Sequence, residues 1–171
     1  MPAGVVLDTR FLITLADESR ANHKTARRYW RHFTEQNLPM FLPTIVVSEF
    51  CIKQPIPPEL LRACVVLPFN WDDAIKAAEL DVSKAERGRE SRVALKDDLK
   101  IIAQGIVKDA AWIITDDADT LYKYVARLRA EDKTKLQPIK LGDGFDPSHF
   151  EPDRQHKLGF ADTTDEPENE E

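Results

Sequence analysis

Cysteine, methionine and long apolar runs are scarce in this chain of 171 residues, which has two cysteines and two methionines. Cys51 and Cys64 are too few for a disulfide framework, and a structural zinc site takes about four Cys or His ligands. The four histidines lie far from both cysteines in the sequence. No apolar run approaches the roughly 18 residues of a membrane span, and residues 5–7 are too short for the core of a signal peptide. These absences argue against disulfide scaffolds, Cys/His metal sites and membrane proteins, and we expect a soluble, cytoplasmic protein.

The chain also lacks an excess of positive charge, which is the usual mark of a protein that binds nucleic acid. It carries 30 acidic and 24 basic residues, and its formal net charge is −6. The negative excess lies at the C-terminus, because residues 151–171 contain eight acids and two bases. The remaining residues, 1–150, contain 22 acids and 22 bases and are therefore neutral overall. The net charge argues against a nucleic-acid partner, but its distribution does not. We expect one domain over residues 1–144 and an acidic, disordered tail over residues 145–171.

Short apolar runs alternate with helical patterns along the chain. Residues 92–108 give the clearest helix, with Leu95, Leu99, Ile102 and Ile106 on one apolar face. The predicted strands cover residues 4–7, 40–42, 64–67, 111–115 and 138–141, and the predicted helices cover residues 19–36, 44–52, 72–86, 92–108 and 120–129. Strands separated by helices are typical of βαβ units, so we predict an α/β fold with a mostly parallel sheet and right-handed crossovers.

Acidic residues directly follow two of the predicted strands. Asp8 comes after the strand at 4–7, and Asp116, Asp117 and Asp119 follow the strand at 111–115. In a doubly wound sheet ligands bind beyond the carboxyl ends of the strands, and crowded carboxylates favour a hard divalent cation such as Mg²⁺. Each acid has a structural alternative, since aspartate is common in turns and at helix N-caps. If the two strands are neighbours, the pattern predicts a metal site for phosphate chemistry.

Three further acids lie within helical patterns. Around the helix at 92–108, Asp98 lies about 100° from Leu99, whereas Asp97 lies about 160° away. Asp98 therefore borders the buried side and Asp97 points to solvent, while the helix dipole favours both as a structural alternative. Glu49 stands in an apolar stretch, where a surface position explains it about as well as a ligand role.

Four segments, taken together and in order, resemble the PIN-domain family of metal-dependent ribonucleases, of which the VapC-type toxins are the best-known branch. They are Val6-Leu-Asp-Thr-Arg-Phe-Leu12, Pro43-Thr-Ile-Val-Val-Ser-Glu-Phe50, Lys96-Asp-Asp-Leu-Lys-Ile-Ile-Ala-Gln104 and Ile113-Ile-Thr-Asp-Asp-Ala-Asp119. Each segment alone is a weak signal, and the resemblance covers roughly residues 4–141. It implies a three-layer α/β/α sandwich with a central parallel sheet.

The resemblance also implies the residues of the site. The family's catalytic acids, which bind Mg²⁺ or Mn²⁺, match Asp8, Glu49, Asp98 and Asp117, and a more variable acidic metal ligand matches Asp119. Thr9 and Thr115 match polar positions beside the metal, and Asp116 falls on a less constrained position. The chain departs from the family's usual residues at Arg10, Gly105 and Thr120. None of these departures removes an acid, so they bear on the branch and the substrate rather than on the metal site.

An RNA substrate needs positive surface, because phosphate contacts dominate affinity. Two runs of bases supply it: Arg20, Lys24, Arg27, Arg28 and Arg31 in the first, and Lys84, Arg87, Arg89, Arg92, Lys96 and Lys100 in the second. A solvated helix face with salt bridges explains either run without RNA. We favour the second run because it leads into the helix that bears Asp98. Arg92, Lys96 and Lys100 are therefore predicted to bind substrate, together with Thr9 and Thr115.

The resemblance implies a divalent-metal-dependent endoribonuclease, with RNA as substrate, an antitoxin protein as partner if the chain is a toxin, and a homodimer as a frequent state of the family. A housekeeping RNA-processing nuclease and a catalytically inactive PIN-like binding module are the alternatives. A receiver-like phospho-acceptor domain also clusters acids at strand ends, but the chain is long for one and lacks a suitably placed lysine. Intact acids at four positions favour the enzyme, since a binding role would not require them.

Overall fold

A five-stranded parallel sheet forms the centre of the molecule. The structure is a computed structural model that describes residues 3–80 and 92–151, with the side chains of residues 92–95 excepted. The strands are β1 (Val5–Leu7), β2 (Met40–Pro43), β3 (Cys64–Leu67), β4 (Trp112–Thr115) and β5 (Gln137–Lys140), in the order β3-β2-β1-β4-β5. Leu7 of β1 pairs with Ile114 of β4, so the two strands followed by acids are neighbours. The predicted strands and their parallel arrangement are confirmed.

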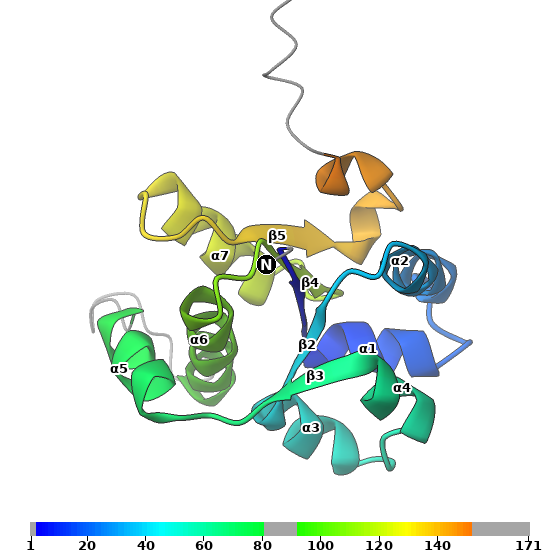
Figure 1. Cartoon of the computed structure of the whole chain (residues 1–171), viewed down its shortest axis with the longest axis horizontal. Coiled ribbons are helices and arrows are strands. Elements are labelled where there is room, and N and C mark those ends of the chain that lie inside the picture. Colours follow the sequence, from blue (N-terminus) through cyan, green and yellow to red (C-terminus); the bar gives the residue numbers. More distant parts are fainter. Residues whose placement is uncertain (1–2, 81–91, 152–171) are drawn as a thin grey trace, which may run out of the picture.

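Helices cover both faces of this sheet. They are α1 (Thr9–Ala16), α2 (His23–Glu35), α3 (Thr44–Cys51), α4 (Pro58–Ala63), α5 (Trp71–Leu80), α6 (Arg92–Val107) and α7 (Leu121–Ala130). Figure 1 shows α1 and α2 on one side of the sheet and α5, α6 and α7 on the other. The predicted three-layer α/β/α architecture is therefore confirmed. No helix within the described ranges is long and apolar enough to cross a membrane.

The central strand β1 has no exposed surface, as expected for a parallel strand covered on both faces. Val5, Val6 and Leu7 are all fully buried. A Cβ added to Gly105 of α6 would lie 3.1 Å from a methyl carbon of Val6, which is tighter than an ordinary contact. Glycine at this position therefore lets α6 pack closely onto β1, and this explains the departure from the family pattern at residue 105.

The segment between β1 and β2 differs from the prediction. The sequence predicted one helix from Ser19, but α1 precedes it and α2 begins at His23. Both the backbone N–H and the hydroxyl of Ser19 donate to Asp17 Oδ1, at 3.0 and 2.6 Å, so Ser19 closes a turn instead of capping a helix. The eight residues of α1 follow Asp8 directly, and that carboxylate accepts the Arg10 N–H at the start of the helix. The short helix α4 was also missed, because its six residues show no complete helical repeat.

The described chain continues beyond β5 through two short 3₁₀ helices, η2 (Leu141–Asp143) and η3 (Pro147–Phe150). The ring centroid of Tyr29 in α2 lies 4.9 Å from that of Phe145, and the centroids of Trp112 and Phe150 are 5.0 Å apart. The Tyr29 hydroxyl donates to the Gly144 carbonyl and accepts the Asp146 N–H. Packing against the domain therefore extends past residue 144. The predicted disordered tail stays a prediction, since residues 152–171 lie outside the described residues.

Candidate metal centre

Four acidic side chains from four separate segments line one pocket at the carboxyl edge of the sheet. Asp8 follows β1, Glu49 lies in α3, Asp98 in α6, and Asp117 follows β4. The pocket has a volume of about 400 Å³, and its other lining residues are Thr9, Arg10, Ile13, Arg20, Lys53 and Thr120. The structure thus brings together the four acids that the sequence analysis selected.

Asp8 is the most deeply buried of these acids, with 3% of its surface exposed. Its Oδ2 atom accepts the Thr115 hydroxyl at 2.6 Å and the Arg10 N–H at 3.3 Å. Burial raises the pKa of Asp8 to about 6 despite these hydrogen bonds, and the charge of Glu49 adds to the rise. The carboxylate therefore serves as the N-cap of α1 and also lines the pocket, so the structural role of Asp8 is compatible with a role in the pocket.

Asp98 carries the largest electrostatic cost in the pocket. Burial, followed by the charges of Asp8, Asp117 and Glu49, raises its pKa to about 8. Such a shift reports carboxylates close enough to repel one another without sufficient compensation. A divalent cation among them would remove this repulsion, so the charges of the pocket suit a metal ion.

Hydroxyl groups orient the remaining two acids. Glu49 Oε2 accepts a short hydrogen bond from the Thr9 hydroxyl. Asp117 Oδ2 accepts the Thr120 hydroxyl at 2.6 Å, and its Oδ1 accepts the N–H groups of Asp119 and Thr120. Burial alone would raise the pKa of Asp117, but these hydrogen bonds and the charge of Arg10 lower it below its ordinary value. Thr120, the third departure from the family pattern, thus has a clear role in holding this carboxylate.

The carboxylates are not arranged as a finished coordination shell. Within residues 3–80 and 92–151, no group of three Asp, Glu, His or Cys side chains is placed so that it could hold a metal ion. Several of the carboxylate oxygens instead accept threonine hydroxyl or backbone N–H hydrogens, as described above. The donor chemistry fits a hard cation such as Mg²⁺, which prefers oxygen ligands and keeps several waters. Binding would require the side chains to turn toward a common point.

The raised pKa of Asp98 predicts a stabilising substitution. In the unfolded chain Asp98 has the ordinary pKa of 3.8, so between this pH and about 8 only the folded protein keeps the proton. The stability of the metal-free protein therefore falls as pH rises through this window. We expect Asp98→Asn to raise the melting temperature in EDTA at pH 8 by about 5 °C, or roughly 1–2 kcal/mol, and to have little effect near pH 4. Asp119→Asn, which removes the same charge from an acid that is 89% exposed and paired with Lys123, is the control and should bring no gain. A lower melting temperature for Asp98→Asn than for the wild type at pH 8 would contradict the destabilisation of the charged Asp98 by burial and by the neighbouring carboxylates.

Comparison with solved structures shows that the fold of this chain is a known one. No protein-family model and no curated protein sequence matches the chain. The crystal structure of VapC20 from Mycobacterium tuberculosis, described as a sarcin-ricin loop cleaving toxin, is similar with a TM-score of 0.50 and 19% identity over 79% of this chain and 100% of that chain. The structure of VapBC2 from Rickettsia felis, bound to a DNA fragment from its promoter, is similar with a TM-score of 0.50 and 12% identity over 80% of this chain and 98% of that chain. The chain has a PIN-like fold. At these identities the likeness concerns the fold alone.

The other predicted site residues lie outside the acidic pocket of this PIN-like fold. Asp119 is 89% exposed and pairs with Lys123 at 3.1 Å. Lys96 is exposed, and Lys100 pairs with Asp97 at 3.1 Å. Neither lysine lines the pocket, and the side chain of Arg92 lies outside the described residues. The two threonines differ, since Thr9 and Thr115 bind the carboxylates of Glu49 and Asp8 directly.

Three basic residues that the site prediction did not include do line the pocket: Arg10, Arg20 and Lys53. Arg10 was noted only as a departure from the family pattern, and Arg20 only as part of a basic run. A sequence signal existed for two of them. Arg10 lies only two residues after Asp8 in the sequence. Lys53 lies four residues after Glu49, a spacing that brings two side chains to the same face of a helix. No sequence signal placed Arg20, because it belongs to the turn between α1 and α2.

Proposed function

We propose that this protein is a divalent-metal-dependent endoribonuclease that hydrolyses RNA phosphodiester bonds. The observation that carries the proposal is the convergence of Asp8, Glu49, Asp98 and Asp117 on one pocket at the carboxyl edge of a PIN-like sheet. Four carboxylates gathered at one place are costly in a protein that has no use for a cation. The description of VapC20 as a toxin that cleaves the sarcin-ricin loop supports RNA as the substrate.

In this proposal Asp8, Glu49, Asp98 and Asp117 hold Mg²⁺ or Mn²⁺. A bound ion supplies Lewis-acid polarisation of the phosphate and activation of water. The chain's own contribution is orientation: the hydroxyls of Thr115, Thr9 and Thr120 fix the carboxylates of Asp8, Glu49 and Asp117. Asp119 is left out of the proposed ligand set because its carboxylate is exposed and paired with Lys123.

The cellular role that we propose is that of the toxin in a toxin–antitoxin pair, with an antitoxin protein as partner. The similarity to a VapC toxin and to a VapBC complex supports this role. A housekeeping RNA-processing nuclease would use the same acids, so the pocket does not separate the two roles. Recovery of a small bound protein with the chain purified from its own host would favour the toxin. A homodimer remains an expectation from the family resemblance.

The proposal is tested by incubating the purified protein with structured RNAs in Mg²⁺, in Mn²⁺ and in EDTA. We expect cleavage with either ion and at least a 100-fold slower reaction in EDTA, since water activation and charge neutralisation both depend on the ion. The products are resolved on denaturing gels, with addition of excess Mg²⁺ to the EDTA sample as the control for reversibility. Cleavage that is insensitive to EDTA would contradict the metal dependence. No cleavage under any condition would favour an inactive binding module.

A further inference from the structure

Three basic residues also line the acidic pocket. Arg10 at the start of α1, Arg20 in the turn between α1 and α2, and Lys53 just after α3 line the same pocket as the four acids. We call these three residues the cationic rim. The rim lies apart from Lys96 and Lys100 of α6, which do not line the pocket and which the sequence favoured for substrate binding.

The rim does not form close ion pairs with the acids. Within the described residues, no side-chain hydrogen bond or salt bridge joins Arg10 or Lys53 to another group. The nearest ion pair of Arg20 is with Asp17, outside the pocket lining, at 3.6 Å from its Nε atom, and this buried Nε has no hydrogen-bond partner. The charge of Arg10 lowers the pKa of Asp117, but no close ion pair occupies the side-chain donors of the rim, so these donors can bind another anion.

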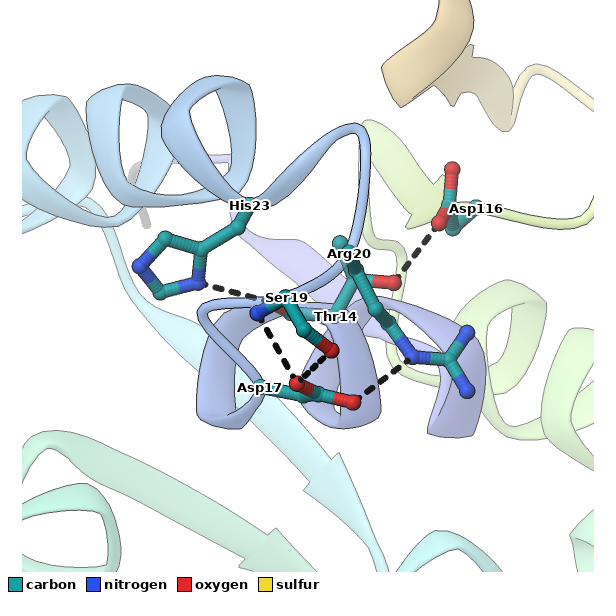
Figure 2. A network of polar contacts seen from close by, with 6 residues as sticks. All are labelled: Thr14, Asp17, Ser19, Arg20, His23 and Asp116. Carbon is teal, nitrogen blue, oxygen red and sulfur yellow. Dashed lines mark hydrogen bonds and ion pairs between the residues drawn. The ribbon is translucent and has the colours of Figure 1, made fainter.

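A network of polar contacts holds the turn that carries Arg20 (Figure 2). Asp116, next to the pocket residue Asp117, accepts the Thr14 hydroxyl at 2.6 Å and the side-chain N–H of Asn22 at 2.7 Å. Nδ1 of the buried His23 donates to the Thr14 carbonyl at 3.0 Å. These contacts tie the turn on both sides of Arg20 to the end of β4. The backbone that carries Arg20 is thus held in place beside the pocket, and the side chain itself is about one third exposed.

We propose that the cationic rim binds an RNA phosphate adjacent to the one that is cleaved. This inference rests on the proposed nuclease function and adds the way in which the substrate is held. The acids and their cation suit the scissile phosphate, and the neighbouring phosphates of a continuous RNA strand need positive partners within the same pocket. Arginine matches phosphate geometry with a fork of N–H donors, whereas lysine supplies a point charge. The rim contains both arginine and lysine, and by binding a neighbouring phosphate it orients the RNA strand relative to the metal site.

The test is the affinity for a fluorescently labelled RNA in EDTA, where cleavage does not interfere. We expect the triple variant Arg10→Ala, Arg20→Ala and Lys53→Ala to bind at least 10-fold more weakly than the wild type, with a lower dependence of affinity on salt concentration. Lys135→Ala, at an exposed lysine outside the pocket lining, is the control for loss of one positive charge and should bind within about twofold of the wild type. The variant Arg10→Lys with Arg20→Lys keeps the charge and should retain most of the salt dependence. Circular dichroism melting confirms that each variant is folded.

Steady-state cleavage in Mg²⁺ separates this inference from the nuclease proposal. A binding role predicts that the triple variant raises KM at least 10-fold and changes kcat much less. If the wild type binds RNA through the rim in EDTA but never cleaves it, the nuclease proposal is wrong and RNA binding by the rim is supported. If the wild type cleaves RNA and the triple variant matches it in affinity and KM, the rim is overturned and the nuclease stands. The proposed role of the rim is equally overturned if the wild type shows no salt-dependent RNA binding, or if Lys135→Ala loses as much affinity as the triple variant.

Discussion

Replacement of Asp8 by asparagine is expected to lower kcat for RNA cleavage in Mg²⁺ by at least about 100-fold. Loss of an outer-shell partner of a metal ligand already costs about 10–100-fold, and Asp8 is proposed as a ligand itself. Its carboxylate is the most buried of the four acids. The other three acids of the pocket come from other segments, so none of them takes the place of Asp8 at the end of β1. The neutral amide keeps the shape of the side chain and an oxygen that can cap α1, so the fold should persist. Burial raises the pKa of Asp8 to about 6, and the metal-free variant should therefore melt no lower than the wild type at neutral pH.

The matched control for this variant is Asp119→Asn, which makes the same change in charge at an exposed acid beyond the pocket. It should cleave RNA at a rate within about twofold of the wild type, as is usual for surface changes away from the chemistry. Both variants are compared by single-turnover cleavage in Mg²⁺ and by melting in EDTA. Full activity in Asp8→Asn would remove Asp8 from the ligand set. A large loss in Asp119→Asn would instead bring the variable fifth acid back into it.

The meeting of Asp8 and Asp117 at the strand ends was predictable because it follows from a general property of parallel sheets. Parallel strands direct their carboxyl ends to one edge, so Asp8 and Asp117 had to meet once β1 and β4 were neighbours. The pairing of Leu7 with Ile114 supplies that condition, which the sequence alone left open. The choice of Asp98 over Asp97 came from helix periodicity, another local rule. Asp98 is indeed the carboxylate that lines the pocket, while Asp97 pairs with Lys100 on the surface.

The cationic side of the pocket was not predictable in the same way. Arg20 reaches the pocket because Asp116 binds Thr14 and Asn22, residues that lie 102 and 94 positions earlier in the chain. No local pattern encodes hydrogen bonds across such separations. The basic run of α6 had clear i, i+4 spacing, which is a local signal, and it led the prediction toward Lys96 and Lys100, whose side chains do not line the pocket. Regular spacing identified a helix face but not the direction in which that face points.

The C-terminal boundary shows a related limit. Periodicity fades after residue 144, because Phe145 and Phe150 are separated by polar residues and lie around short 3₁₀ turns. Their partners are Tyr29 and Phe33 of α2 and Trp112 of β4, which are distant in sequence. Aromatic packing of this kind depends on the finished fold. The composition of the last residues predicts an acidic tail but does not locate the place where packing ends.

Truncation after Gly144 is accordingly expected to be strongly destabilising. It removes Phe145 and Phe150, which pack against the core, and leaves the buried Tyr29 without its ring neighbour at 4.9 Å. Loss of a fully buried phenylalanine costs about 3–5 kcal/mol, and two partly buried ones should together cost a similar amount. The melting temperature should fall by roughly 10 °C or more, since about 1 kcal/mol shifts it by about 2–4 °C in a chain of this size.

Truncation after Glu151 provides the control, because it keeps both phenylalanines and removes residues 152–171, with seven acids and two bases. This form should melt within about 2 °C of the full chain, because the acidic, polar composition of the removed residues predicts little contribution to a core. The double substitution Phe145→Ala and Phe150→Ala in the full chain should reproduce most of the loss seen on truncation after Gly144. That result would assign the effect to aromatic packing and extend the folded domain to Phe150. Equal melting temperatures for the two truncated forms would instead place the end of the domain at residue 144.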